Sequence, residues 1–181
     1  MSSRPHPTTK QLLDQFSQEP NYSDPSQDQF EALSRDRVPV RSLAASDLDA
    51  VVRIDRHRSG AERRTFYKRK FDEALGESGV RVSLVAEQDG LVVGFIMARV
   101  DYGDFGRAET TAVIDTIGVD PEMTGRDVGR ALISQLLANL ASLRVETVRT
   151  EIEWNRFGLA GFLERCGFQP GQQLALSRPL G

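Results

Sequence analysis

The residues best suited to chemistry lie in the stretch IGVDPEMTGRDVGRALISQLLANL, residues 117–140. Its first half has the pattern of a buried strand that runs into a turn, and its second half that of an amphipathic helix. Two glycines and two arginines, Gly125, Arg126, Gly129 and Arg130, lie at the junction. The first N–H groups of a helix lack intrahelical acceptors and therefore bind anions, phosphate above all. Both the Gly-Lys-Ser/Thr phosphate loop and the GxGxxG fingerprint are absent, so we expect a different phosphate ligand.

Length and composition limit the classes of protein to which the chain can belong. The 181 residues carry a net charge of −3 and one cysteine, Cys166. The longest basic cluster is ERRTFYKRK, which is no nucleic-acid footprint, so no nucleic acid is expected as a partner. One cysteine cannot form an intramolecular disulfide or a cysteine-based zinc site, and we expect no metal. The sequence predicts neither a signal peptide nor a membrane span, so we expect a soluble cytoplasmic protein that does not bind membranes.

The pattern of residues divides the chain into a tail and a domain. Residues 1–36 combine four prolines with Ser, Gln and Asp, which predicts a disordered tail. Residues 37–181 are expected to form one α+β domain. Its expected elements are a strand over 38–43, a helix with its N-cap at Ser46, a helix over 60–75, strands over 80–88, 91–100 and 110–119, a helix over 127–143, a strand over 145–154, a helix over 156–166 and a strand over 172–180.

Three features of this pattern predict how the sheet is built. Asp89-Gly90 joins two β-rich runs, which is the strongest short-range signal for a hairpin. The second run, LVVGFIMARV, is almost continuously apolar, so we expect a central strand covered on both faces. The helix over 127–143 connects two strands by a crossover, which predicts that they are parallel. This helix should pack on the sheet through leucines at spacings of four and three: Leu132, Leu136, Leu140 and Leu143.

The order of the elements and two local motifs resemble the GCN5-related N-acetyltransferase (GNAT) superfamily. IGVDPEMTGRDVGRALI looks like its motif A, a strand followed by a loop of the pattern Arg/Gln-x-x-Gly-x-Gly/Ala that opens a helix. WNRFGLAGFLERCGF looks like a later segment with Asn-x-x-Ala, a helix and Gly-Phe. The resemblance covers the chain from Val38 onward. It implies an α/β sandwich-like domain with a mixed, mostly antiparallel central sheet of about six to seven strands flanked by helices. It also implies an acetyl-CoA-dependent N-acetyltransferase in which a primary amine attacks the thioester directly.

The resemblance assigns a cofactor site as well. In the family, the loop amides bind the pyrophosphate of acetyl-CoA, and the strand before the loop offers backbone partners to pantetheine. An asparagine after the next strand matches Asn155 and is expected to contact the pantetheine amides. The residues expected to bind the cofactor are Ile117, Val119, Thr124, Gly125, Arg126, Asp127, Val128, Gly129, Arg130 and Asn155.

Two positions depart from the family pattern. Aligned on Gly129, the Arg/Gln position is Thr124 and the middle glycine is Asp127, whose carboxylate has the same charge as a pyrophosphate. We expect the Asp127 side chain to point away, with only its N–H facing the ligand. The tyrosine that protonates the leaving thiolate in many members is Leu163 here. A thiolate can leave without a strong acid, so this loss is expected to slow turnover rather than abolish it.

The base that accepts the proton of the amine is sought among carboxylates, because the chain has only two histidines, His6 in the tail and His57 at the end of a helix. Asp115 interrupts the apolar run TAVIDTIGV and is the candidate base. Desolvation there would raise the pKa of its carboxyl, which suits a base near neutral pH. A structural aspartate bonded to a neighbouring strand or turn is an equally good interpretation.

Strand alternation puts Asp115 on the same face as Val113, Ile117 and Val119. Glu151 and Glu153 on the next strand either reach the same cleft or form an outer polar face, and the sequence favours the outer face.

The sequence does not identify the amine, which is a small molecule or a protein amine. A turn with the sequence DYGDFGR has an acidic rim, which would favour a cationic acceptor: Asp101, Tyr102, Asp104 and Glu109. The oligomeric state is left open, a homodimer included. The alternative function is a non-catalytic acyl-CoA-binding or protein-interaction module with a degenerate site. A further alternative is an α+β binding domain without a cofactor.

Overall fold

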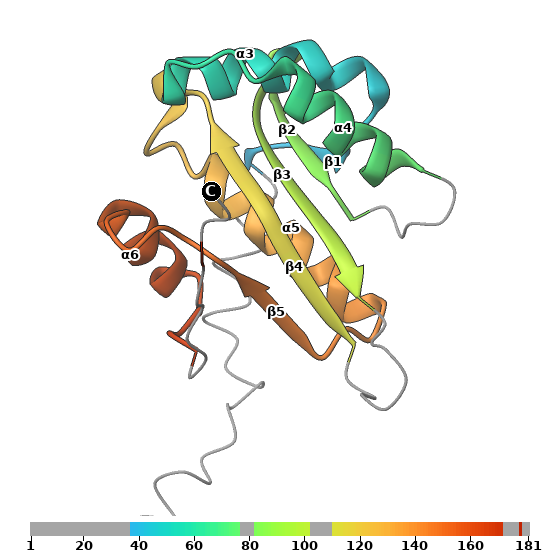
Figure 1. The fold of residues 1–181 in the computed structure, drawn as a ribbon, viewed down its shortest axis with the longest axis vertical. Coiled ribbons are helices and arrows are strands. Elements are labelled where there is room, and N and C mark those ends of the chain that lie inside the picture. Colours follow the sequence, from blue (N-terminus) through green and yellow to red (C-terminus); the bar gives the residue numbers. More distant parts are fainter. Residues whose placement is uncertain (1–36, 77–81, 102–109, 172–177, 179–181) are drawn as a thin grey trace, which may run out of the picture. The chain divides into compact units, whose positions relative to one another are not determined.

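The computed structural model describes residues 37–76, 82–101, 110–171 and 178, all within the unit formed by residues 31–181 (Figure 1). The expected tail, residues 1–36, lies outside the described residues. The elements, in chain order, are β1 (Val40–Ser42), a 3-10 turn (Ala45–Asp47), α3 (Leu48–Ser59), α4 (Arg64–Leu75), β2 (Leu84–Gln88), β3 (Leu91–Asp101), β4 (Thr111–Val119), a 3-10 turn (Pro121–Met123), α5 (Val128–Ser142), β5 (Thr147–Thr150) and α6 (Phe157–Arg165).

The five strands of the described residues form one sheet in the order β1-β2-β3-β4-β5. Strands β1 to β4 are antiparallel neighbours, and β4 pairs with β5 in parallel. The mixed sheet and the parallel pair are therefore confirmed. The last expected strand, over 172–180, lies outside the described residues except for residue 178, so the described part contains five of the six to seven strands expected.

The hairpin between β2 and β3 has the predicted two-residue turn. Asp89 has a φ of 51° and Gly90 a φ of 75°. Positive φ at both central positions is characteristic of a type I′ turn, whose twist matches that of the two strands. The turn therefore sets the register in which Gln88 faces Leu91.

Two apolar cores cover the two faces of the sheet, with β3 as the middle strand. Residues 92–98 of β3 are all buried, which confirms the expected central strand. Alternate residues of β3 face opposite sides: Ile96 belongs to the core under α5, and Phe95 and Met97 belong to the core under α3 and α4. Figure 1 shows α5 running behind the strands, with α3 and α4 above them.

Helix α5 packs on the sheet through most of the predicted leucine stripe. Leu132, Leu136 and Leu140 are at most 1% exposed, and full burial of each stabilises the fold by roughly 1.5–3 kcal/mol. Leu143 does not belong to the stripe, because α5 ends at Ser142 and Leu143 is its C-cap, 40% exposed.

The start of the first helix differs from the prediction. A 3-10 turn precedes α3, and Asp47 rather than Ser46 is the N-cap of α3. Asp47 is buried, and its carboxylate accepts a hydrogen bond from the Ala44 amide at 2.8 Å. The Arg41 guanidinium binds both oxygens of Asp47 at 2.7 and 2.8 Å. Burial opposes ionisation of Asp47, but the bonds from Arg41 and Ala44 outweigh burial and hold the pKa of Asp47 below its usual value.

The second helix is shorter than predicted. It starts at Arg64, because Gly60 ends α3 in the left-handed conformation with a φ of 70°. Its apolar side chains Tyr67 and Phe71 are buried against the sheet. No helix within the described ranges combines the length and apolar character needed to cross a membrane.

Candidate active site

Strand β4 separates from β5 halfway along its length. The two strands pair only from Thr111↔Thr147 to Ile114↔Thr150, and the Thr150 hydroxyl donates to the Ile114 carbonyl at 3.0 Å where the pairing stops. Beyond this point β4 continues to Val119 with no strand on that side among the described residues. Figure 1 shows the two strands diverging there. The free backbone groups of this edge can bind an extended ligand in the way a strand would.

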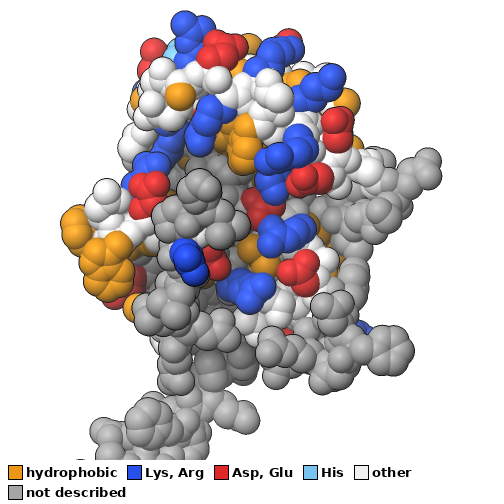
Figure 2. All heavy atoms as spheres, in the orientation of Figure 1, with side chains coloured by type: hydrophobic (Ala, Val, Ile, Leu, Met, Phe, Trp, Pro, Cys, Tyr) orange, Lys and Arg blue, Asp and Glu red, His pale blue; other side chains and the backbone are white. Residues whose placement is uncertain are grey.

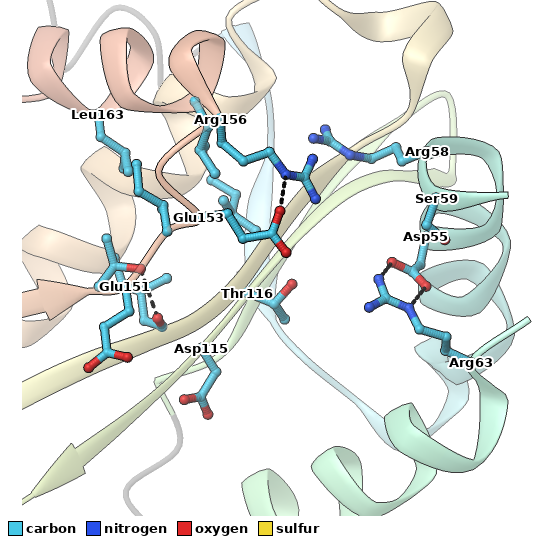
Figure 3. A pocket seen from close by; sticks show the side chains of 15 residues that line it. Asp55, Arg58, Ser59, Arg63, Asp115, Thr116, Glu151, Glu153, Arg156 and Leu163 are labelled. Carbon is cyan, nitrogen blue, oxygen red and sulfur yellow. Dashed lines mark hydrogen bonds and ion pairs between the residues drawn. The ribbon is translucent and has the colours of Figure 1, made fainter. Parts of the chain in front are cut away.

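A cavity of about 210 Å³ opens beside the free edge. Its walls come from α3 and the turn after it, from residues Ile114 to Ile117 of β4, and from the segment that runs from β5 into α6. Figure 2 shows acidic and basic side chains interspersed on the face that it draws, and Figure 3 shows charged side chains entering the cavity from both sides. The cavity thus joins elements that are far apart in the sequence.

The wall formed by α3 carries a buried carboxylate with a fixed partner. The Asp55 side chain is 8% exposed and binds the Arg63 guanidinium through both oxygens, with Nε at 2.8 Å from Oδ2. This hydrogen bond to Asp55 is the main reason that the pKa of Arg63 is raised. The guanidinium also lies 5.8 Å from the ring centroid of Phe66 and 6.0 Å from that of Tyr67. Arg63 is therefore held in place by one charge and two rings.

Tyr67 lies outside the cavity and supports Thr116, one of the β4 residues that line it. It is 1% exposed, and its hydroxyl interacts with the side chains of Thr116 and Asp55. Burial, followed by the negative charge of Asp55, raises the pKa of Tyr67 to about 12. The phenol therefore stays neutral at physiological pH and fixes Thr116, which lines the cavity.

Asp115 lies at a bulge in β4. Met97 pairs with Thr116, but the next residue, Ala98, pairs with Ile114, so Asp115 is an extra residue without a partner on β3. A bulge interrupts alternation, and Ile114 and Ile117 both contribute to the core under α5. The expectation that Asp115 shares a face with Ile117 and Val119 is therefore wrong.

Two cations engage the carboxylate of Asp115. The Lys70 amine lies 3.2 Å from Oδ2, and the Arg99 guanidinium binds Oδ1. For Lys70, burial opposes the charged form, but hydrogen bonds to Glu73 and Asp115 outweigh it and raise its pKa. Lys70 therefore connects α4 to β4.

The wall formed by the segment after β5 carries two exposed carboxylates. Glu151 and Glu153 both line the cavity rather than only an outer face. Arg156 lies 3.5 Å from Glu153 and lines the cavity too. Within the described ranges, no ion pair to Glu151 is present. Asn155 is exposed in the turn before α6 and is not part of the cavity wall.

The loop after β4 leads into an uncapped helix. Gly125 has a φ of 80° with open space where a Cβ would be, and Asp127, the N-cap of α5, has a φ of 59° and makes no side-chain capping bond. Both residues are exposed. In the described part of the chain, no acceptor is found for the amides of Gly125, Asp127, Val128 and Gly129. These four amides remain available to an anion.

Gly129 also has a packing role that the sequence did not predict. A Cβ at this position would lie 3.1 Å from Cζ of Phe162 on α6. The glycine therefore lets α6 approach the start of α5. Its presence has two physical causes, the open helix terminus and this close contact.

Leu163 lines the cavity with a side chain that is only 5% exposed and packs in the core under α5. None of the described residues in the cavity wall is a tyrosine. The described residues also contain no group of three His, Cys, Asp or Glu side chains arranged to bind a metal ion.

Several solved structures share this arrangement of strands and helices. The aminoglycoside N-acetyltransferase AAC(6')-Iy in complex with CoA matches with a TM-score of 0.67 at 16% identity, covering 80% of this chain and 95% of that chain. A transcriptional regulator from Bacillus halodurans matches with a TM-score of 0.67 at 16% identity, covering 79% and 99%. The ribosomal-protein alanine N-acetyltransferase from Escherichia coli matches with a TM-score of 0.62 at 21% identity, covering 75% and 79%. These similarities define a GNAT-like fold.

The sequence itself establishes the family. The model of the acetyltransferase (GNAT) family matches residues 48–168, from the start of α3 to the Gly-Phe after α6. The chain therefore belongs to the GNAT acetyltransferase family, as its motifs predicted.

Proposed function

We propose that the protein is an acetyl-CoA-dependent N-acetyltransferase that transfers the acetyl group to a primary amine by direct attack. The observation that carries this proposal is that an unpaired strand edge and an uncapped helix N-terminus follow one another in the chain. The open edge of β4 begins at Asp115, and the uncapped N-terminus of α5 follows the end of the same strand. An extended ligand with a pyrophosphate can bind to both features at once.

The loop fits the pyrophosphate of acetyl-CoA. The four free amides, the open space at Gly125 and the guanidinium of Arg126 would hold it through backbone and charge-assisted hydrogen bonds. The family pattern Arg/Gln-x-x-Gly-x-Gly/Ala also fits when it starts at Arg126, with Gly129 and Ala131 as the small residues. Ala131 is fully buried, as a small-residue position requires. In this alignment Asp127 occupies an unrestricted position, and its carboxylate makes no bond to the helix amides.

Acetyl-CoA supplies a thioester, whose carbonyl carbon forms the new C–N bond with the amine while the C–S bond breaks and the sulfur leaves as a thiolate. The chain must accept one proton from the amine. Asp115 is our first candidate, and since Arg99 and Lys70 engage both of its oxygens, it would act through a water. Glu151 is the second candidate, because it lines the cavity and its carboxylate has no ion-pair partner among the described residues. With Leu163 in place of a tyrosine, the thiolate would take its proton from water.

Thiol release from acetyl-CoA with a panel of primary amines tests this function. We expect turnover with at least one amine, and a loss of about 100-fold in kcat/KM in either Asp115→Asn or Glu151→Gln. The variant with the larger loss identifies the base. Binding of acetyl-CoA without thiol release for any amine would contradict the proposal and favour the non-catalytic module.

A further inference from the structure

The walls of the cavity carry opposite excess charge. The wall from α3 and the following turn contributes Asp55, Arg58, Ser59 and Arg63. The one carboxylate among the described residues of this wall, Asp55, is already bound through both oxygens by Arg63. Two guanidiniums therefore face one fully engaged carboxylate, which leaves an excess positive charge on this wall.

Both arginines of this wall keep hydrogen-bond donors for a ligand. Arg63 uses Nε and Nη2 for Asp55, and no partner of its Nη1 is found among the described residues, while its side chain is 47% exposed. Arg58 makes one long bond, 3.4 Å, to the carbonyl of Val119. Figure 3 shows Arg58 and Arg63 reaching from α3 and the turn after it toward the middle of the cavity. Guanidinium groups with free donors match the geometry of a carboxylate.

The opposite wall carries an excess negative charge. Glu151 and Glu153 face a single guanidinium, Arg156, which lies 3.5 Å from Glu153. Glu151 thus remains available to an ammonium group. Of the acidic rim expected from the turn DYGDFGR, Asp101 is already engaged, because it lies 3.7 Å from Arg99 and 4.0 Å from Arg149. The other three residues of that rim, at positions 102, 104 and 109, lie outside the described residues.

The cavity is also small. Its volume of about 210 Å³ is below the roughly 300–1,000 Å³ of pockets that enclose drug-sized ligands. A small acceptor with both charges would place one charge on each wall.

We infer that the acceptor is a small amine that also carries a carboxylate, a molecule of amino-acid type. Arg58 and Arg63 bind its carboxylate, and Glu151 attracts its ammonium group toward the open edge of β4. This inference rests on the proposed acetyltransferase function and names its substrate class. It adds a carboxylate to the cationic amine that the sequence favours.

The test compares matched acceptors by thiol release from acetyl-CoA. Each amino acid of a panel, such as glycine, β-alanine and L-glutamate, is paired with its carboxamide and with a diamine of similar length. Aminoethylphosphonate and taurine show whether another anionic group replaces the carboxylate. We expect the best carboxylated acceptor to exceed its carboxamide and its diamine by about 30-fold in kcat/KM, since a charge-assisted pair is lost in both. A diamine or carboxamide that reacts equally well would overturn the inference, and so would a clear preference for the phosphonate or sulfonate.

Arg58→Gln tests the binding wall directly. It should lower kcat/KM for the carboxylated acceptor by about tenfold through KM, while the carboxamide reaction changes less than twofold. Arg56→Gln is the matched control, because Arg56 lies on the same helix, is 66% exposed and pairs with Glu62 outside the cavity. Equal losses for carboxylate and carboxamide in Arg58→Gln would contradict the inference.

The acceptor class and the acetyltransferase function can be refuted separately. Acetyl-CoA that binds and is consumed with diamines only would refute the acceptor class and leave the acetyltransferase intact. If acetyl-CoA binds but no acceptor of the panel reacts, the acceptor class is refuted as well. A protein that does not bind acetyl-CoA would refute the proposed function itself.

Discussion

The two halves of β4 differ in what surrounds them. From Thr111 to Ile114 the strand has β3 on one side and β5 on the other. From Asp115 to Val119 only β3 remains among the described residues. The first half contains Ala112 and Ile114, at most 3% exposed, whereas Ile117 and Val119 of the second half are only partly buried.

This difference indicates that the first half of β4 contributes to stability and the second half to ligand binding. Unpaired strand edges are costly and invite wrong partners, so proteins usually cover them. An edge left open beside a charged cavity is more readily explained by a ligand than by stability. We therefore expect substitutions in the first half of β4 to unfold the protein and substitutions in the second half to weaken binding.

The largest expected effect comes from truncating a core residue of the first half. Ile114→Ala should lower the free energy of unfolding by about 2–5 kcal/mol, because Ile114 is 3% exposed. Ile117→Ala, on the same face of the second half, should cost about 1 kcal/mol because Ile117 is only partly buried. Urea denaturation of both variants measures the difference. Equal losses would show that the two halves do not differ in their contribution to stability.

Gly129→Asp should have the next largest effect, on cofactor binding in addition to the packing cost of any Cβ at this position. A carboxylate among the free amides at the start of α5 should lower acetyl-CoA affinity by about 100-fold, through like charge and blocked access. Calorimetric titration with acetyl-CoA measures this loss. Unchanged acetyl-CoA affinity in this variant would show that the loop does not bind the pyrophosphate.

The packing role of Gly129 needs its own control, because a Cβ would press on Phe162. Gly129→Ala should weaken both stability and binding. Adding Phe162→Leu should restore much of the stability while binding stays weak. Full recovery of binding in the double variant would mean that the glycine serves helix packing alone.

The smallest expected effect concerns Tyr67, which supports the second half of β4 through Thr116. Its pKa is raised to about 12, whereas an unfolded tyrosine ionises near about 10. The stabilisation is therefore complete below pH of about 10 and is lost as the pH rises through the folded pKa. Between pH 10 and 11 the wild type should lose about 1 kcal/mol more stability than Tyr67→Phe. Equal losses of stability in the wild type and Tyr67→Phe, measured by urea denaturation, would contradict the raised pKa of the buried Tyr67 hydroxyl.

Local sequence patterns predicted most of the described fold. Asp89-Gly90 determines its turn by itself, and the leucine spacing of α5 follows from one helical period. The ends of elements were less predictable, since Leu143 fits the period although the helix has already ended. The N-cap of the first helix was missed because Asp47 takes its partner, Arg41, from another element.

The candidate site was less predictable because it depends on pairing between distant segments. The bulge at Asp115 arises from register with β3, so alternation along β4 alone gave the wrong face. Asp55 and Arg63 become a pair only when Gly60 turns α3 toward α4. A signal was available at Asp55, an acid on the buried face of an amphipathic helix, and such a residue needs a partner.

Calorimetric titration of the purified protein with acetyl-CoA tests the central claim most directly. The open edge of β4 and the free amides of α5 predict binding with a dissociation constant on the order of micromolar. This result would show that the loop accepts a pyrophosphate despite Asp127. No heat of binding at millimolar acetyl-CoA would contradict the account and show that the second half of β4 does not hold this cofactor.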